Sequence, residues 1–132
     1  MAGSTQDWLS QLMSLVTVCG RLETRCAYGA PWQVIYGESA PGEMPYHVIL
    51  RGNAVLDVPG RVPQPLATGD IVMIPDGSAH GLHDGSGIAP APAHRRKTQN
   101  LVISENAGAG ERLDMLCGRF VISPPHDRFV SD

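Results

Sequence analysis

Apolar residues occur along this chain in short runs, and Gly, Pro, Asn or Asp separate most of these runs. Short runs between turn residues are typical of β-strands in a sandwich or barrel. They predict strands over the following residues: 16–26, 32–36, 46–50, 54–57, 71–74, 100–104 and 113–122. The segments at 59–65 and 84–97 have turn residues but no regular apolar period, which predicts loops there.

The first residues show a helical period instead. Polar residues at 4–7 can cap a helix, and apolar residues then recur at helical spacing: Trp8, Leu9, Leu12, Met13 and Val16. We therefore expect a short helix at about 7–15, a barrel at about 16–123 and a C-terminal stub at 124–132. One domain, residues 1–132, is expected to hold all three, because this length is typical of a single domain.

Composition narrows the class of protein. The chain is 42% hydrophobic and only 17% charged, so it is not a disordered chain. The net charge is −3 and the one basic cluster is at 95–97, so we expect no DNA binding by this chain alone. No apolar stretch reaches the ~20 residues that span a bilayer, and no basic leader starts the chain. These features predict a cytoplasmic protein without a membrane contact.

The stretch from residue 69 to residue 80 predicts a more specific fold. Gly69, Pro75, Gly77 and His80 have the spacing Gly, five residues, Pro, one residue, Gly, two residues, His. This spacing resembles the second signature motif of the cupin barrels, in which the His points into the barrel and often binds a metal. The apolar run at 71–74 within it predicts a buried strand. The resemblance implies a mainly all-β fold, a small jelly-roll-like double-stranded β-barrel.

The first cupin motif departs from the pattern of the metal enzymes. In that family it supplies His-x-His and then a Glu. Aligned on Gly52, these positions hold Ser39, Pro41 and Pro45, none of which can bind a metal. His47 lies two residues beyond the expected Glu. The departure counts against a three-His-one-Glu enzyme site.

A substitute site from other residues remains open. Glu43, His47, His80 and His83 carry donors that suit Zn²⁺, Ni²⁺ or Fe²⁺, and the candidate metal ligands are His47, His80 and His83. His80 and His83 are three apart, so on a regular strand they face opposite ways unless the chain bends. The alternative is that His47 and His80 are hydrogen-bonded core or pocket residues.

Candidate pocket residues can also be named from the predicted strands. The expected ligand-binding set is Trp32, Tyr36, Glu43, His47 and His80. Trp and Tyr also fill barrels well, so both aromatic residues have a plain core role as their alternative. His80 is the central prediction, because the motif places it where an inward side chain enters the barrel.

Four further segments narrow the resemblance: 8–13, 30–32, 45–48 and 116–120. Together they resemble the N-terminal sensor domain of AraC/XylS-type transcription regulators over nearly the whole chain. In such proteins the barrel binds an effector, the following helices support dimerisation, and a C-terminal helix-turn-helix module binds DNA. The resemblance therefore implies a homodimer that binds a small-molecule effector or ion, with its DNA-binding domain absent from this chain. The alternative is a small metal-dependent cupin enzyme, a dioxygenase or isomerase.

Three cysteines make an odd count, which favours reduced thiols. Cys19 and Cys26 lie seven apart and would need a turn at Gly20 or Arg21 to form a bridge, so we expect none. Cys117 is expected to be a small buried apolar residue. Redox sensing is the alternative, and it requires an exposed thiol with a lowered pKa.

Overall fold

The computed structural model describes residues 10–11 and 20–121. The helix expected at 7–15 lies outside the described residues except for its residues 10–11, and the stub at 124–132 lies wholly outside. Cys19 is likewise not described. In the described part of the chain no helix has the length and apolar character that crossing a membrane needs.

Strands account for most of the described chain. In chain order they are β1 (Gly20–Gly29), β2 (Gln33–Tyr36), β3 (Glu43–Arg51), β4 (Asn53–Asp57), β5 (Gln64–Ala67), β6 (Ile71–Met73), β7 (His80–His83), β8 (Ala93–Lys97), β9 (Val102–Asn106) and β10 (Arg112–Val121). Turn residues separate most of them, as the sequence predicts for a barrel. The mainly all-β prediction is confirmed.

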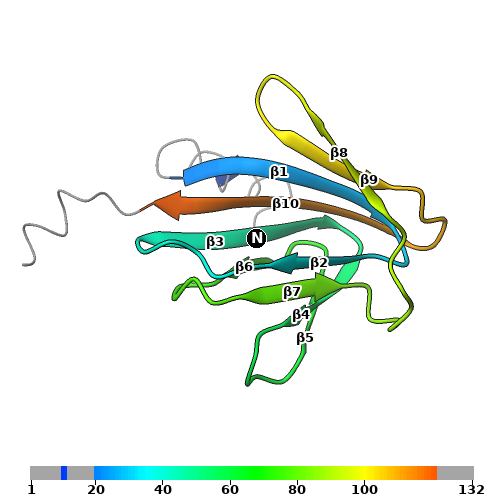
Figure 1. Ribbon diagram of the computed structural model, residues 1–132, viewed down its shortest axis with the longest axis horizontal. Helices are drawn as coiled ribbons and strands as arrows, with labels where there is room; N and C mark the ends of the chain where they lie inside the picture. The colour runs from blue at the N-terminus through cyan, green and yellow to red at the C-terminus, as the bar shows by residue number, and fades with distance from the viewer. Residues whose placement is uncertain (1–9, 12–19, 122–132) are drawn as a thin grey trace, which may run out of the picture.

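The strands form two sheets. The larger has the order β6-β3-β10-β1-β9-β8 and the smaller the order β2-β7-β4-β5. Among the described strands all pairs are antiparallel except β1 with β9. Figure 1 shows β1, β10 and β3 side by side in one layer, with β2, β7 and β4 in the layer below them. The two sheets together make a small barrel, as the resemblance to the cupin motif implies.

Strand alternation sends one face of each sheet into the barrel. On β10 the inward residues are Leu113, Met115 and Cys117, and the register places Met115 opposite Ile49 and Cys117 opposite His47. Buried apolar side chains from both sheets fill this space: Cys26, Tyr28, Trp32, Ile49, Ala54, Leu56, Leu66, Ile74, Leu82, Leu113, Met115 and Cys117. His47 is thus held in the core by the strands on either side of it.

The opposite face of the larger sheet is apolar as well. Tyr46 and Val48 of β3 are buried there, and Leu22, Leu116 and Phe120 pack against them. The Tyr46 hydroxyl donates a hydrogen bond to a backbone carbonyl of β1, 3.2 Å away. Apolar residues on both faces explain the consecutive apolar residues at 48–50 of β3.

Two glycines of the motif adopt the left-handed conformation that the spacing predicts. Gly69 has a φ of 95° and Gly77 a φ of 68°. The Gly77 N–H donates to the Ile74 carbonyl at 3.0 Å and closes the turn. The Gly77 carbonyl in turn accepts from the Ser39 N–H at 2.9 Å, so the turn before β7 also fixes the loop before β3.

The prediction of a buried strand at 71–74 is wrong in its burial. Ile71 and Met73 are 40% and 44% exposed, whereas Val72 packs against the core and Ile74 is buried. The strand lies at the edge of the larger sheet, so only its inner face is covered. A run that is apolar at every position therefore also occurs on an edge strand.

The two predicted loops are also too long. Residues 93–97 of the segment 84–97 form β8, an edge strand whose five side chains are all exposed. It has no apolar alternation, so the sequence carries no signal for it. β5 begins at Gln64 and includes Pro65, inside the loop expected at 59–65. β5 is an edge strand, where a proline without an N–H is tolerated.

The positive φ of Gly77 yields a stability prediction. We expect Gly77→Val to lower the free energy of unfolding by about 1–3 kcal/mol, because a β-branched residue is strained at this φ, and its Cβ would lie 3.0 Å from the Ser39 Cβ. Gly37→Val is the matched control, since no atom lies within 4 Å of a Cβ added there. Denaturant unfolding measures both variants. Equal midpoints and slopes for Gly77→Val and the wild type would contradict this role of the turn.

Candidate functional site

Two buried histidines meet inside the barrel, one from each sheet. His47 lies on β3 and is 1% exposed, and His80 is the first residue of β7 and is 4% exposed. Their Nε2 atoms are 2.7 Å apart, which is a hydrogen-bond distance. His80 therefore points inward, as the motif predicts, and its partner is the histidine of the other predicted strand.

The hydrogen-bond partners determine where the ring protons lie. His80 Nδ1 is 2.9 Å from the carbonyl oxygen of Ser78, which can only accept, so Nδ1 carries the proton. In the neutral ring His80 Nε2 is then an acceptor, and His47 Nε2 must donate to it. His47 Nδ1 is left without a proton and needs a donor of its own.

That donor is the thiol of Cys117. Its Sγ lies 3.1 Å from His47 Nδ1 and 3.4 Å from the hydroxyl of Tyr36. The thiol donates to the imidazole and accepts from the phenol. A single direction of donation thus runs from Tyr36 through Cys117, His47 and His80 to the carbonyl of Ser78. We call these four side chains the polar chain.

Burial keeps His47, Tyr36 and Cys117 of the polar chain uncharged. It lowers the pKa of His47 to about 3, with a smaller contribution from the neighbouring His80. Burial also raises the pKa of Tyr36. The neighbouring Cys26 sulfur and burial both raise the pKa of the Cys117 thiol. At neutral pH the chain therefore holds its protons in hydrogen bonds and has no ionised side chain at His47, Tyr36 or Cys117.

A cavity of about 330 Å³ opens over the polar chain. Tyr36, His47, His80 and Cys117 form its floor, and the Tyr36 ring stacks on the His80 ring with centroids 4.9 Å apart. The remaining lining residues come from β1, β3, β10 and the loop before β3: Glu23, Thr24, Gly37, Glu38, Ser39, Ala40, Glu43, Pro45, Gly118 and Arg119.

An arginine organises the mouth of this cavity. Arg119 Nε lies 2.9 Å from a carboxylate oxygen of Glu23, and Arg119 Nη1 lies 2.6 Å from one of Glu43. The guanidinium thus links β10 to β1 and to β3. Glu43 is one of the predicted ligand-binding residues, and the structure places it at the mouth rather than beside the histidines.

The structure places Trp32 differently from the prediction. Trp32 is 3% exposed and stacks on Tyr28, with ring centroids 5.7 Å apart. It belongs to the core cluster and does not line the cavity above His47. Tyr36, the last residue of β2, is the aromatic wall of the cavity.

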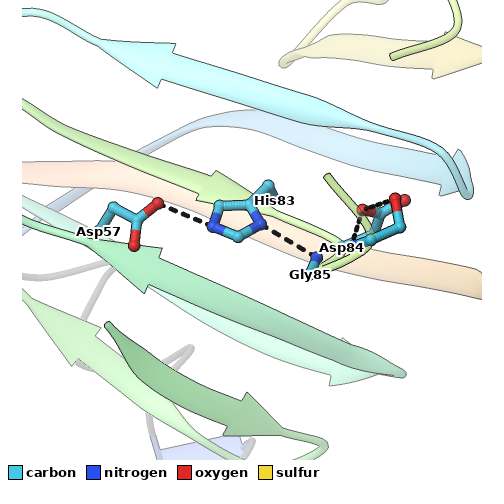
Figure 2. A network of polar contacts seen from close by, with 5 residues as sticks. Asp57, His83, Asp84 and Gly85 are labelled. Atoms are coloured by element: carbon cyan, nitrogen blue, oxygen red, sulfur yellow. Dashed lines mark hydrogen bonds and ion pairs between the residues drawn. The ribbon is translucent and has the colours of Figure 1, made fainter. Parts of the chain in front are cut away.

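His83 does not join the other two histidines. Its Nε2 lies 2.7 Å from an oxygen of Asp57, and its Nδ1 accepts from the Gly85 N–H at 3.0 Å (Figure 2). His83 follows His80 by three residues on β7, so its side chain leaves the opposite face, as strand alternation requires. The three-histidine metal set is therefore not assembled. Within residues 10–11 and 20–121 no group of three or more His, Cys, Asp or Glu side chains is arranged to hold a metal ion.

The residues present do not fit the metal of a cupin enzyme. Among the described residues two imidazoles converge, and their Nε2 atoms already satisfy each other. The nearest carboxylate of the candidate set, on Glu43, is bound to Arg119. A divalent ion at His47 and His80 remains a prediction without the further ligands that such an ion needs.

Glu23, Cys117 and Arg119 line the cavity and were not predicted as site residues. All three lie on β1 or β10, far along the chain from the two motifs. The register that places Cys117 opposite His47 is fixed by the paired strands. The alternation of Leu113, Met115 and Cys117 does predict one shared face, but no signal in the sequence shows that His47 lies on it.

The two described cysteines are reduced, as expected, but Cys117 is not a purely apolar core residue. Cys26 and Cys117 are both free and buried. The buried position expected for Cys117 is confirmed, but its sulfur makes polar contacts with His47 and Tyr36 as well. The expectation that Cys19 and Cys26 form no disulfide stays a prediction, because Cys19 lies outside the described part of the chain.

Comparisons with known proteins identify the family. The family model described as Cupin matches residues 7–132, so the chain belongs to the cupin family. The HTH-type transcriptional regulator MtrA of Neisseria gonorrhoeae is 32% identical over 117 residues, which cover 86% of this chain and 38% of that protein. The RCS-specific HTH-type transcriptional activator RclR of Escherichia coli is 32% identical over 76 residues, 58% of this chain and 27% of that protein.

Solved structures agree with the fold. The cupin domain of an XRE family transcriptional regulator from Enterobacter cloacae has a TM-score of 0.50 at 8% identity, and the match covers 74% of this chain and 77% of that chain. This likeness shows the fold alone. The chain spans less than two-fifths of the length of the regulators MtrA and RclR that it resembles.

The buried, neutral His47 yields a prediction for pH. Its pKa is about 3 in the folded chain, against 6.5 for a free imidazole ring. Below pH 6.5 the unfolded chain takes up a proton that the folded chain refuses, so stability is lost as the pH falls from 6.5 towards 3. We expect His47 to contribute a slope of up to about 1.4 kcal/mol per pH unit in this window.

Denaturant unfolding at several pH values measures this slope. His47→Gln should flatten the curve between pH 6.5 and 3, because glutamine does not titrate there. His94→Gln, on the exposed strand β8, is the control and should keep the wild-type slope. An unchanged slope in His47→Gln would show that the buried ring is not the group responsible.

Proposed function

We propose that this chain is the ligand-binding sensor and dimerisation domain of an AraC-type transcription regulator whose DNA-binding helix-turn-helix domain lies outside this sequence. The observation that carries the proposal is the cavity of about 330 Å³ over a buried polar floor. Ligand sites are concave and combine an apolar wall with a few convergent polar groups. The matched relatives are named as transcriptional regulators, which supports a regulatory use of such a cavity.

The side chains at the first motif favour binding over metal catalysis. A cupin metal enzyme, the alternative, needs ligands at the positions that hold Ser39, Pro41 and Pro45 here. A replacement set would have to gather around His47 and His80, and the described residues do not place a third ligand there. The cavity therefore suits a ligand held by hydrogen bonds and charge.

The position of the site suggests how binding is passed on. His47 belongs to the larger sheet and His80 to the smaller one, so the floor of the cavity is a contact between the two sheets. A ligand that alters this contact changes how the sheets sit on each other. In the proposed regulator this change would reach the dimer and the DNA-binding domain.

The dimer and the lack of DNA binding are the two parts of the proposal that do not rest on the cavity. A homodimer is implied by the resemblance to AraC-type sensors. Absence of DNA binding by this chain alone follows from its net charge of −3. The same proposal includes a cytoplasmic location, where a DNA-binding regulator acts.

Replacing His80 tests the proposal. We expect compounds that raise the melting temperature of the wild-type chain in a screen of small metabolites to have no effect on His80→Ala, because the ring forms part of the cavity floor. His83→Ala, on the outer face of the same strand, is the matched control and should keep the response. A His80→Ala chain that is less stable but still responds to the same compounds would make His80 a core residue only.

A further inference from the structure

We propose that the cavity selects a small organic ammonium ion, and this inference rests on the proposed sensor function. Two independent features of the cavity point to this ligand class. One is the direction of the hydrogen bonds in its floor, and the other is the balance of charges at its mouth. The size of the cavity then limits the body of the ligand.

The floor offers lone pairs and no polar hydrogens. The protons of Tyr36, Cys117, His47 and His80 are each donated along the polar chain, the last one to the carbonyl of Ser78. The acceptor capacity left over belongs to the Tyr36 oxygen, because a hydroxyl has two lone pairs. Among these four side chains, a ligand that only accepts hydrogen bonds finds no free donor, whereas a ligand with N–H groups finds an acceptor.

The mouth carries more carboxylates than cations. Of the residues that the structure describes, Glu23, Glu38 and Glu43 line the cavity together with one cation, Arg119. The guanidinium contacts Glu23 and Glu43, and its charge is thereby compensated. An ionised carboxylate accepts about four hydrogen bonds, so Glu23 and Glu43 can still accept from a second cation. The four charged groups sum to −2, which disfavours an anionic ligand.

The volume sets the size of the ligand. A cavity of about 330 Å³ lies at the lower end of the usual range of about 300–1,000 Å³ for small-molecule sites. Ala40, Pro45 and Gly118 give part of its wall an apolar surface. These features fit a primary amine with one compact aliphatic or aromatic body, rather than a long polyamine.

A metal ion is a poorer match for the same negative charge. Both Nε2 atoms of His47 and His80 are engaged with each other at 2.7 Å, and an ion would have to break this bond. An ammonium ion leaves the polar chain intact, because its donors need only oxygen atoms at the mouth and at Tyr36. An ammonium ion can thus pair with the carboxylates at the mouth while the hydrogen bonds of the floor stay unbroken.

Three probes that share a phenyl ring with one attached carbon, but differ in their polar group, test the ligand class. Benzylammonium, benzyl alcohol and benzoate are titrated into the ¹⁵N-labelled chain, and the backbone amide shifts of the cavity residues are followed by NMR. We expect benzylammonium to shift Gly37 and Gly118 and to bind at least about tenfold more tightly than benzoate. Glu43→Gln should weaken benzylammonium by about tenfold through the loss of one carboxylate. Glu105→Gln, whose carboxylate pairs with Arg96 on the exposed edge, should leave it unchanged.

The outcomes separate the ligand class from the sensor function. Tighter binding of benzoate would overturn the ammonium class while the cavity remains a ligand site. Binding of benzylammonium that Glu43→Gln does not weaken would place the amine elsewhere and also overturn the assignment. Zn²⁺ that shifts the His47 and His80 signals and displaces benzylammonium would assign the site to a metal. If none of these probes moves the cavity residues, the ammonium assignment fails, while the sensor function is still decided by the metabolite screen with His80→Ala.

Discussion

The contact between the imidazoles of His47 and His80 is the interaction on which the rest of the site depends. It joins the two sheets inside the barrel, where an unpaired polar group would cost about 1–3 kcal/mol. Each ring is held by a second partner, Cys117 on one side and the Ser78 carbonyl on the other. Because the carbonyl can only accept, one backbone group fixes the direction of every proton in the chain.

Much of the fold could be predicted from the sequence, because its strands follow local rules. The glycine turns around 69 and 77 have the positive φ that the motif requires, and His80 points inward. What could not be predicted depends on pairing between distant strands. Cys117 meets His47 through the register of β10 with β3, and the exposed edge strand β8 has no apolar period to reveal it. The apolar run at 71–74 was misleading because an edge strand can be apolar on both faces.

The cupin barrel supports many functions, so function has to be argued from the site. Here the first-motif positions lack metal ligands, and the polar residues that remain satisfy one another. The result is a floor of mutually hydrogen-bonded side chains below a charged mouth, where Arg119 links β10 to Glu23 and Glu43. A site of this kind can bind a ligand without catalysing a reaction, as the proposed sensor domain requires. The regulators that this chain resembles provide the context for that use.

The central claim is the direction of the hydrogen bonds through the two histidines. Long-range ¹H–¹⁵N NMR of the histidine side chains at neutral pH measures it directly, because protonated and bare ring nitrogens have distinct shifts. The account predicts a protonated Nε2 and a bare Nδ1 for His47, with a protonated Nδ1 and a bare Nε2 for His80. A His47 ring protonated at Nδ1, or at both nitrogens, would contradict the account, because Cys117 could then not donate to it.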